Sequence, residues 1–311
     1  MDVSKSVFQS VTYRAKNGKE FSFYIKRDDC IDVHVSGNKW RKLKYAIAFA
    51  KEKQAKGIVT FGGAFSNHLV ATAKACQNAG LKSIGIVRGE ELNEESNATL
   101  QQCAAFGMEL VFVPRATYTM RSDYEYQTCV KDSYQGYYLV PEGGAGFHGV
   151  VGCQEIVQEL PLTPDVIYVA SGTGTTAAGI LLGASEKTQV KSVSVLKGDF
   201  MRAEILKLVN SVLFNNEETE ELGKQLSVVT NVHFGGYGKW TKELIDFIQD
   251  FFVQTGIKLD PIYTGKAVFA LITDFSNEVV NSTQQIVFVH TGGLQGIAGV
   301  EEKLSYQLFN S

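Results

Sequence analysis

DVIYVASGTGTTAAGILLGA, residues 165–184, shows most clearly how this chain folds. Its first part is mostly β-branched and aromatic, which favours a strand, and its last part is rich in alanine and leucine, which favour a helix. Between them, SGTGTT (171–176) combines glycines and hydroxyls in the way that is typical of a turn. The stretch therefore predicts a buried strand that ends in a polar loop and continues directly into a helix.

The same alternation recurs along the chain from about residue 55 onward. We predict further strands at GIVTFGG (57–63), SIGIVRG (83–89), MELVFVP (108–114), GYYLVPEGG (136–144), VKSVSVL (190–196) and QIVFVHTGG (285–293). Helical patterns separate most of them, and the first of these patterns, SNHLVATAKACQNAG, stops at Gly80, a residue typical of a helix C-cap. Strands that alternate with helices are typical of parallel sheets covered by helices.

The bulk composition indicates a globular protein and excludes several function classes. The chain has 311 residues, enough for two domains, with 44% hydrophobic and 20% charged residues and a net charge of -3. A nucleic-acid partner would usually need a basic face. The start of the chain has no apolar segment typical of a signal peptide, and no apolar run is long enough to span a membrane. We therefore expect a cytoplasmic protein with no membrane or nucleic-acid partner.

The cysteines do not suggest a metal or disulfide framework. There are 5 of them, an odd number, and no pair has C-x-x-C spacing. We expect buried, reduced thiols and no metal site.

Three of the predicted strands end in clusters of glycine, serine and threonine. These are GGAFSNH (62–68), SGTGTT (171–176) and HTGG (290–293). Because ligands of open α/β sheets bind at the carboxyl ends of the strands, we expect the functional site to be built from these loops.

The loop at 171–176 is a candidate anion site. It opens a helix, where unpaired N–H groups and a partial positive charge favour an anion, and its glycines let a phosphate approach the backbone. Thr173, Thr175 and Thr176 add hydroxyl donors. The monoester phosphate of a cofactor such as pyridoxal phosphate (PLP) suits a loop so rich in hydroxyls.

Two other interpretations of this loop stay open. Gly172-x-Gly174-x-x-Ala177 fits the dinucleotide fingerprint, but the acid expected at the end of the next strand would be Asp199, which comes late and after Lys197. A helix start with an ordinary cap is the second interpretation. The sequence G-x-x-x-x-G-K-[ST] does not occur, so a P-loop is not supported.

Lys39 is a candidate for covalent binding of a cofactor. A Schiff-base lysine needs an amine that can be neutral, and cationic neighbours favour this state. Lys39 opens a predicted helix in SGNKWRKLKY (36–45), where the helix dipole together with Arg41 and Lys42 would lower its pKa. The alternative is a solvated basic helix start, for which Gly37-Asn38 supplies a turn and an N-cap.

Several motifs, in order along nearly the whole chain, resemble the 1-aminocyclopropane-1-carboxylate (ACC) deaminase / D-cysteine desulfhydrase family of fold-type-II PLP enzymes. They are KRDD (26–29), SGNKWRKLKY (36–45), TFGGAFSNH (60–68), VPEGG (140–144), VASGTGTTAAG (169–179), FGGYG (234–238), LDPIYTGKA (259–267) and HTGG (290–293). These motifs are specific jointly, although none is specific alone. One departure is Ala145-Gly146, where relatives often carry a polar pair.

The resemblance implies a role for individual residues of this chain. Lys39 would carry PLP as a Schiff base, Ser66 would lie beside the substrate, and Asn67 would bind the phenolic oxygen of the cofactor. Tyr237 and Tyr263 would lie near the ring and the substrate. His68 would pack near the site without acting as a base.

The resemblance also implies the remaining cofactor contacts. Two of these contacts help to predict which substrate the enzyme uses. Thr173, Gly174, Thr175 and Thr176 would bind the phosphate. ACC deaminases carry Glu and Leu where this chain has Thr264 and Thr291, and the threonines are the desulfhydrase-like pattern. A carboxylate beside the pyridine nitrogen of the cofactor would favour the protonated form of that nitrogen. Opening of the cyclopropane ring of ACC should need this protonated form more than loss of a thiolate from cysteine does. Helix capping is the alternative explanation for both threonines.

The fold implied by the resemblance is a pair of open parallel-sheet α/β domains with helices on both faces and the cofactor in the cleft between them. The smaller domain would span 46–150, and the larger would combine 1–45 with 151–311. Family members are usually homodimers, so a homodimer is implied as well.

The function implied is PLP-dependent β-elimination from a small amino acid, most simply D-cysteine, to pyruvate, ammonia and sulfide. ACC deaminase activity, which would give 2-oxobutanoate and ammonia, is the nearest alternative. An NAD(P)-binding oxidoreductase built on residues 172–177 belongs to another class. A binding protein without catalysis is a further alternative, against which the presence of Lys39 argues.

Overall fold

The computed structural model describes residues 1–309 and divides into two compact units. Unit 1 combines Met1–Asn38 with Cys153–Ser311, and unit 2 is Lys39–Gly152. The chain passes from one unit to the other within helix α1 (Asn38–Glu52) and within helix α6 (Phe147–Gln158). The domain boundaries expected from the sequence, 46–150 for the smaller domain, stay a prediction.

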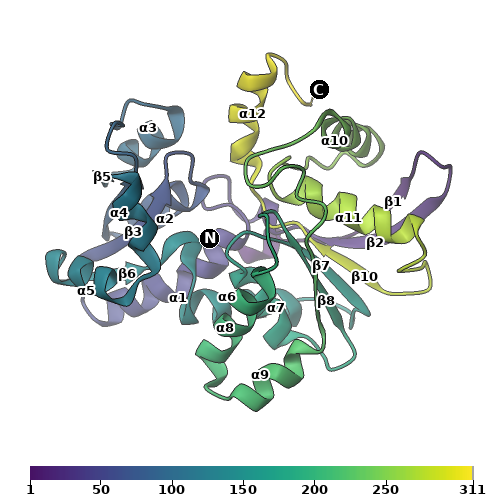
Figure 1. The fold of residues 1–311 in the computed structure, drawn as a ribbon, viewed down its shortest axis with the longest axis horizontal. Helices are drawn as coiled ribbons and strands as arrows, with labels where there is room; N and C mark the ends of the chain where they lie inside the picture. Colours follow the sequence, from purple (N-terminus) through teal and green to yellow (C-terminus); the bar gives the residue numbers. More distant parts are fainter. Residues whose placement is uncertain (310–311) are drawn as a thin grey trace. The chain divides into compact units, whose positions relative to one another are not determined.

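Unit 1 is built on one sheet whose strands lie in the order β1-β2-β10-β7-β8-β9 (Figure 1). Their bounds are β1 Phe8–Arg14, β2 Glu20–Lys26, β7 Val166–Ser171, β8 Gln189–Ser194, β9 Leu226–Val229 and β10 Ile286–Val289. The hairpin β1–β2 is antiparallel, and every other pairing in this order is parallel. The carboxyl ends of β7 and β10 therefore lie next to each other, as do their following loops.

Helices cover both faces of this sheet. Unit 1 contains α7 (Thr175–Gly183), α8 (Met201–Leu213), α9 (Asn216–Gly223), α10 (Lys242–Thr255), α11 (Thr264–Ser276) and α12 (Ile297–Leu304). In Figure 1, α10 and α11 lie on one side of the sheet, and α7 and α8 on the other.

Side-chain alternation along β7 explains why helices are needed on both sides. Val166, Tyr168 and Ala170 join the core cluster that α10 and α11 complete. Because successive side chains of a strand point to opposite faces, Ile167 and Val169, which are also fully buried, point to the other face.

Unit 2 contains a second sheet, with strand order β5-β4-β3-β6 and parallel pairing throughout. Its strands are β3 Gly57–Gly63, β4 Lys82–Arg88, β5 Met108–Val113 and β6 Tyr137–Val140. Its remaining helices are α2 (Asn67–Ala79), α3 (Ala98–Ala105), α4 (Arg115–Thr119) and α5 (Tyr124–Ser133). Helix α2 ends at Gly80, whose left-handed backbone (φ 71°) is the C-cap expected from the sequence.

The predicted α/β class with open, largely parallel sheets is confirmed. The hairpin β1–β2 and the short strand β9 were not predicted. Within residues 1–309, none of the helices combines the length and the apolar character that a membrane-spanning helix requires. The five cysteines, all within that range, are free thiols, but the expectation that all are buried was wrong: Cys76, Cys103 and Cys153 are buried, whereas Cys30 and Cys129 are exposed.

Candidate active site

The loop between β7 and α7 requires glycine at one position and leaves little room for a side chain at a second. Gly174 is the N-cap of α7 and has a positive φ of 77°, and a Cβ there would lie 2.8 Å from Cγ1 of Ile205. A Cβ on Gly172 would lie 3.2 Å from Cε1 of Tyr263. The backbone of this loop is therefore packed closely against its neighbours and can be approached closely by a ligand.

The same loop concentrates hydrogen-bond donors. The first N–H groups of α7 have no partner within the helix, as at any helix start. Thr175 and Thr176 are buried, and the hydroxyl oxygens of Thr173 and Thr175 lie 3.0 Å apart. Backbone N–H groups, threonine hydroxyls and the positive end of a helix dipole are the donor set that suits a phosphate monoester. The loop fits the phosphate of PLP.

Asn38, which directly precedes Lys39, is held beside this loop within unit 1. The side-chain amide of Asn38 donates to Oγ1 of Thr176 (2.8 Å), and its backbone N–H donates to the carbonyl of Thr291 (3.2 Å). Gly37 lies so close to that carbonyl that a Cβ would be 2.1 Å from the oxygen. Asn38 is therefore fixed to the loops that follow β7 and β10, and Lys39 is the next residue in the chain.

The loop HTGG after β10 is organised by its histidine. Nε2 of His290 lies 2.8 Å from the carbonyl oxygen of Lys258, and the backbone N–H of Gly292 donates to Nδ1 of His290 (3.3 Å). His290 is fully buried. The imidazole of His290 thus stabilises the loop that contains Thr291 through these two hydrogen bonds.

Asp260 organises the start of α11. Its carboxylate accepts from the backbone N–H groups of Ile262, Tyr263 and Thr264, and from Oγ1 of Thr264, at 2.6–2.9 Å. The hydroxyl of Thr264 in turn accepts from the backbone N–H of Asp260 (2.9 Å). Both side chains are fully buried. The hydroxyl hydrogen of Thr264 is thus donated to Asp260 within the protein.

The two tyrosines of the predicted site lie together. The rings of Tyr237 and Tyr263 make a T-shaped pair with centroids 5.9 Å apart. Tyr263 also lies against Gly172 of the loop after β7. The structure therefore brings Tyr237 and Tyr263 to the candidate phosphate site of unit 1.

In unit 2, the loop between β3 and α2 contains Ser66 and Asn67. Ser66 is the N-cap of α2, and its hydroxyl oxygen accepts from the backbone N–H of Leu69 (3.4 Å). Accepting this bond leaves the O–H hydrogen of Ser66 available to a ligand. Both residues are half-buried, at the carboxyl end of a parallel strand.

His68, which follows them, is buried and neutral. Oγ1 of Thr60 lies 2.8 Å from Nε2 of His68 and 2.7 Å from the carbonyl oxygen of Val140. Burial, reinforced by the nearby charges of Lys39 and Lys42, lowers the pKa of His68 to about 3. The positive charge of Lys39 therefore contributes to lowering the pKa of His68, the residue that follows Ser66 and Asn67.

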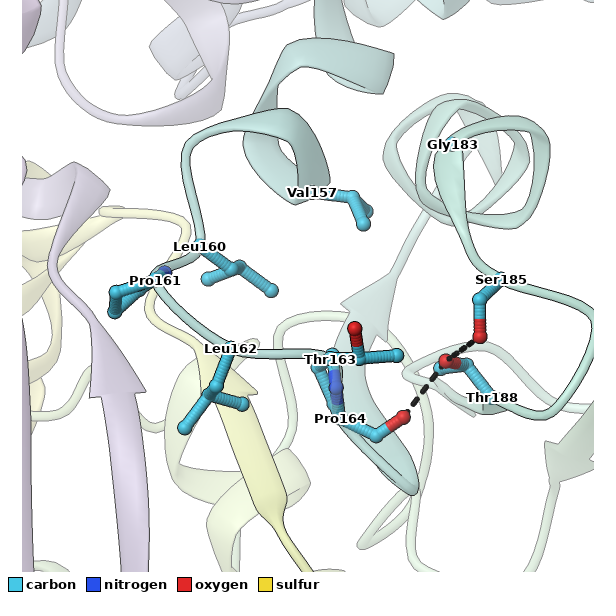
Figure 2. Close-up of a pocket in the computed structure, with 9 residues that line it drawn as sticks. All are labelled: Val157, Leu160, Pro161, Leu162, Thr163, Pro164, Gly183, Ser185 and Thr188. Carbon is cyan, nitrogen blue, oxygen red and sulfur yellow. Dashed lines mark hydrogen bonds between the residues drawn. The ribbon is translucent and has the colours of Figure 1, made fainter.

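Two pockets lie elsewhere in the described residues. Figure 2 shows one of about 300 Å³ in unit 1, lined by apolar side chains and by the Ser185–Thr188 pair. It lies before β7 and β8, at their amino ends, whereas the Gly/Ser/Thr loops follow their carboxyl ends. The other, of about 330 Å³, is lined within unit 2 by residues that include Lys42 and Gly144–Gly146.

Sequence reasoning missed three residues that organise the site. Asn38, Asp260 and Lys266 are all buried and all lie within motifs quoted above. The signal available in the sequence was the presence of polar or charged residues inside otherwise apolar, Gly-rich blocks. The partners of Asn38 and Lys266 could not be identified from the sequence because they come from distant segments, whereas those of Asp260 lie within four positions of it.

Comparisons with known proteins agree with this chemistry. The family described as "Pyridoxal-phosphate dependent enzyme" matches residues 7–292. A putative ACC deaminase of Pyrococcus horikoshii is 33% identical over 289 residues, which cover 90% of this chain and 87% of that protein. The mitochondrial bifunctional D-cysteine desulfhydrase/ACC deaminase of Arabidopsis thaliana is 30% identical over 306 residues, covering 90% of this chain and 74% of that protein.

A solved structure shares the fold over almost the whole length. The crystal structure of an ACC deaminase homologue superposes with a TM-score of 0.75 at 30% identity, and covers 93% of this chain and 89% of that chain.

Proposed function

The chain belongs to the pyridoxal-phosphate dependent enzyme family, and we propose that it is a lyase that eliminates the β-thiol of D-cysteine. With the uptake of one water, the reaction would convert D-cysteine to pyruvate, ammonia and hydrogen sulfide. Cleavage of ACC to 2-oxobutanoate and ammonia is the second candidate, favoured by the name of the Pyrococcus horikoshii relative, whereas the Arabidopsis thaliana relative is named for both activities.

The cofactor would be held by the residues that the sequence singled out. Lys39 would bind it covalently, and Thr173, Gly174, Thr175 and Thr176 would hold its phosphate. Around the ring, the contacts would come from Asn67, Tyr263, Thr264 and Thr291. When bound, PLP supplies an electron sink that makes the bonds to the substrate's Cα labile.

Proton transfer would fall to residues of this chain. Nζ of Lys39, once released by the amine of the substrate, would take the proton from Cα. The O–H hydrogen of Ser66, whose oxygen already accepts from Leu69 N–H, is available to bind the substrate's carboxylate or to relay a proton. Tyr237 and Tyr263 would line the substrate side of the site.

The observation that carries the choice of D-cysteine over ACC is the neutral residue at position 264. Thr264 brings no charge, and the nearest carboxylate in its bonding network, that of Asp260, is occupied by four donors at the start of α11. Without a carboxylate aimed at it, the ring nitrogen would be protonated less often. Loss of a thiolate tolerates this, because the leaving group takes the electrons, whereas opening of a cyclopropane ring does not.

Side-by-side kinetics test this proposal. We expect the PLP-loaded enzyme to have a kcat/KM for D-cysteine at least tenfold above that for ACC, measured as pyruvate and 2-oxobutanoate, with L-cysteine as the enantiomeric comparison. D-alanine, which lacks a leaving group at Cβ, is the matched control and should give no keto acid by elimination. Turnover of ACC equal to or above that of D-cysteine would favour the second candidate.

The assembly and location of the protein belong to the same proposal. We propose a homodimer, because the family resemblance implies it, and we keep the cytoplasmic location that was expected from the sequence. Sedimentation equilibrium of the PLP-loaded protein would measure the assembly directly.

A further inference from the structure

Lys266 is a buried cation that the proposed chemistry does not use. It lies in the first turn of α11 and is 0% exposed. Both features oppose a positive charge, because burial removes its hydration and the start of a helix is itself positive. A lysine in this position needs an interaction that compensates for these costs.

The compensating interaction is with the loop that contains Tyr237. The ammonium of Lys266 donates to the backbone carbonyls of His233 (2.8 Å) and Gly236 (2.9 Å). The loop has positive φ angles at Phe234 (50°), Gly235 (95°), Gly236 (108°) and Gly238 (66°). A positive φ at phenylalanine is strained, so the surrounding structure has to hold the loop in this conformation.

Two contacts connect this loop to α11, and one connects it to the candidate active site. The ring of Phe234 packs edge-on against Phe269 at 5.0 Å, one turn after Lys266. The side chain of Tyr237 is 52% exposed. Among the residues that the structure describes, 1–309, its ring forms an aromatic pair only with that of Tyr263. The position of Tyr237 is therefore set mainly by the backbone of its own loop.

We propose that Lys266 is a positioning residue that holds loop 233–238 in the conformation that places Tyr237 beside Tyr263 at the active site. The inference rests on the proposed function, because the part of Tyr237 in catalysis is itself proposed. The ammonium of Lys266 would then affect the rate of the reaction by holding Tyr237 in place, without contacting the substrate or the cofactor.

The geometry separates this role from a contribution to folding stability. Each of the two carbonyls keeps a backbone donor without Lys266: His233 O accepts from Gly236 N–H (3.0 Å), and Gly236 O accepts from Lys239 N–H (3.2 Å). Burial lowers the pKa of Lys266 to about 8, against the opposing charge of Asp260, so the charged form is destabilised in the folded protein. Replacing a buried ion by an apolar side chain of similar length is often neutral or stabilising.

The test uses Lys266→Met and Lys266→Gln in the PLP-loaded enzyme. Amide hydrogen exchange should be at least tenfold faster in Lys266→Met for the hydrogen-bonded N–H groups of Gly235, Gly236 and Lys239. Lys266→Gln, which keeps one donor, should be intermediate. The midpoint of thermal unfolding and the PLP content should stay at the wild-type values or above, while kcat/KM falls at least tenfold.

A double-mutant cycle shows whether the effect acts through the tyrosine. If Lys266 works by placing Tyr237, the losses in Lys266→Met and Tyr237→Ala should not add, and the double variant should be no slower than Tyr237→Ala. The matched control is Lys191→Met, which removes an ammonium bonded to Asp274 near the other end of α11 and should leave exchange at 233–239 unchanged.

Several results would overturn the inference. Unchanged amide hydrogen exchange in the loop of Lys266→Met would overturn it. So would a double variant whose loss of kcat/KM equals the product of the losses in the two single variants. Failure of both Lys266 variants to fold would assign the residue a structural role instead. An inactive wild type without bound PLP would instead contradict the proposed function, and unchanged loop exchange in Lys266→Met would contradict this inference independently of that result.

Discussion

The hydroxyl of Thr60 determines which nitrogen of His68 carries the hydrogen. A carbonyl oxygen can only accept, so the single hydroxyl hydrogen of Thr60 is donated to Val140 (2.7 Å). Oγ1 of Thr60 must then accept from Nε2–H of His68 (2.8 Å). Nδ1 of His68 is left as a buried acceptor for which the described residues give no partner. His68 is therefore a neutral acceptor next to Ser66 and Asn67, and not a cation at physiological pH.

We predict that His68 stays neutral, with the hydrogen on Nε2, from pH 7 down to pH 5, because its pKa is about 3. Nitrogen-15 NMR of histidine-labelled protein measures this, with His68→Gln to assign the signal. Between pH 6.5 and about pH 3, the unfolded chain binds a proton here that the folded protein does not. The free energy of unfolding should therefore fall as the pH falls through that window, by up to roughly 1.4 kcal/mol per pH unit. A midpoint near pH 6.5 for His68 would contradict the assignment.

At the scale of elements, the site depends on how loops are joined, and the loop after β7 is the clearest case. Thr176 lies at the start of α7, where it accepts from the side chain of Asn38. One hydroxyl thus contributes to the candidate phosphate cradle and fixes the residue that precedes Lys39. Changes at Thr176 should affect the cofactor more than the fold.

We predict that Thr176→Val weakens PLP affinity tenfold to a hundredfold. Loss of a hydrogen bond to a charged group costs about 1.5–3 kcal/mol, which corresponds to this range. The matched control is Thr188→Val, which removes a buried hydroxyl that donates to Pro164 O (2.7 Å) at the amino end of the same sheet. Fluorimetric titration of the apo-proteins with PLP measures both. Equal affinities in the wild type and in Thr176→Val would place the phosphate elsewhere.

Strands with continuous apolar runs could be predicted from the sequence, whereas the N-terminal hairpin was missed. The buried strands β3 and β7 match their predicted ranges closely, because parallel strands covered on both faces are apolar throughout. In β2, Phe21, Phe23 and Ile25 are buried and alternate with polar residues, and Gly18 in the connecting turn has a positive φ of 80°. The alternation and the Asn-Gly pair were hairpin signals available in the sequence.

At the scale of the whole molecule, the family and the α/β class could be predicted because ordered motifs span the chain. The hydrogen-bond partners could not, because they lie far apart in the sequence. Asn38 and Thr176 are separated by 138 positions, and Lys266 and His233 by 33. No local pattern encodes such a pair. The roles that the motifs suggest for Ser66, Asn67, Tyr237, Tyr263 and the other site residues stay predictions.

We propose that Lys39, which directly follows Asn38 in the chain, is the residue that binds PLP. Reduction of the yellow holoenzyme with borohydride, followed by proteolysis and peptide mapping, tests it most directly, with Lys39→Ala as the control that should take no label. We predict that the pyridoxyl group is found on Lys39. A pyridoxyl group on Lys42, Lys266 or any other lysine would contradict the assignment of Lys39.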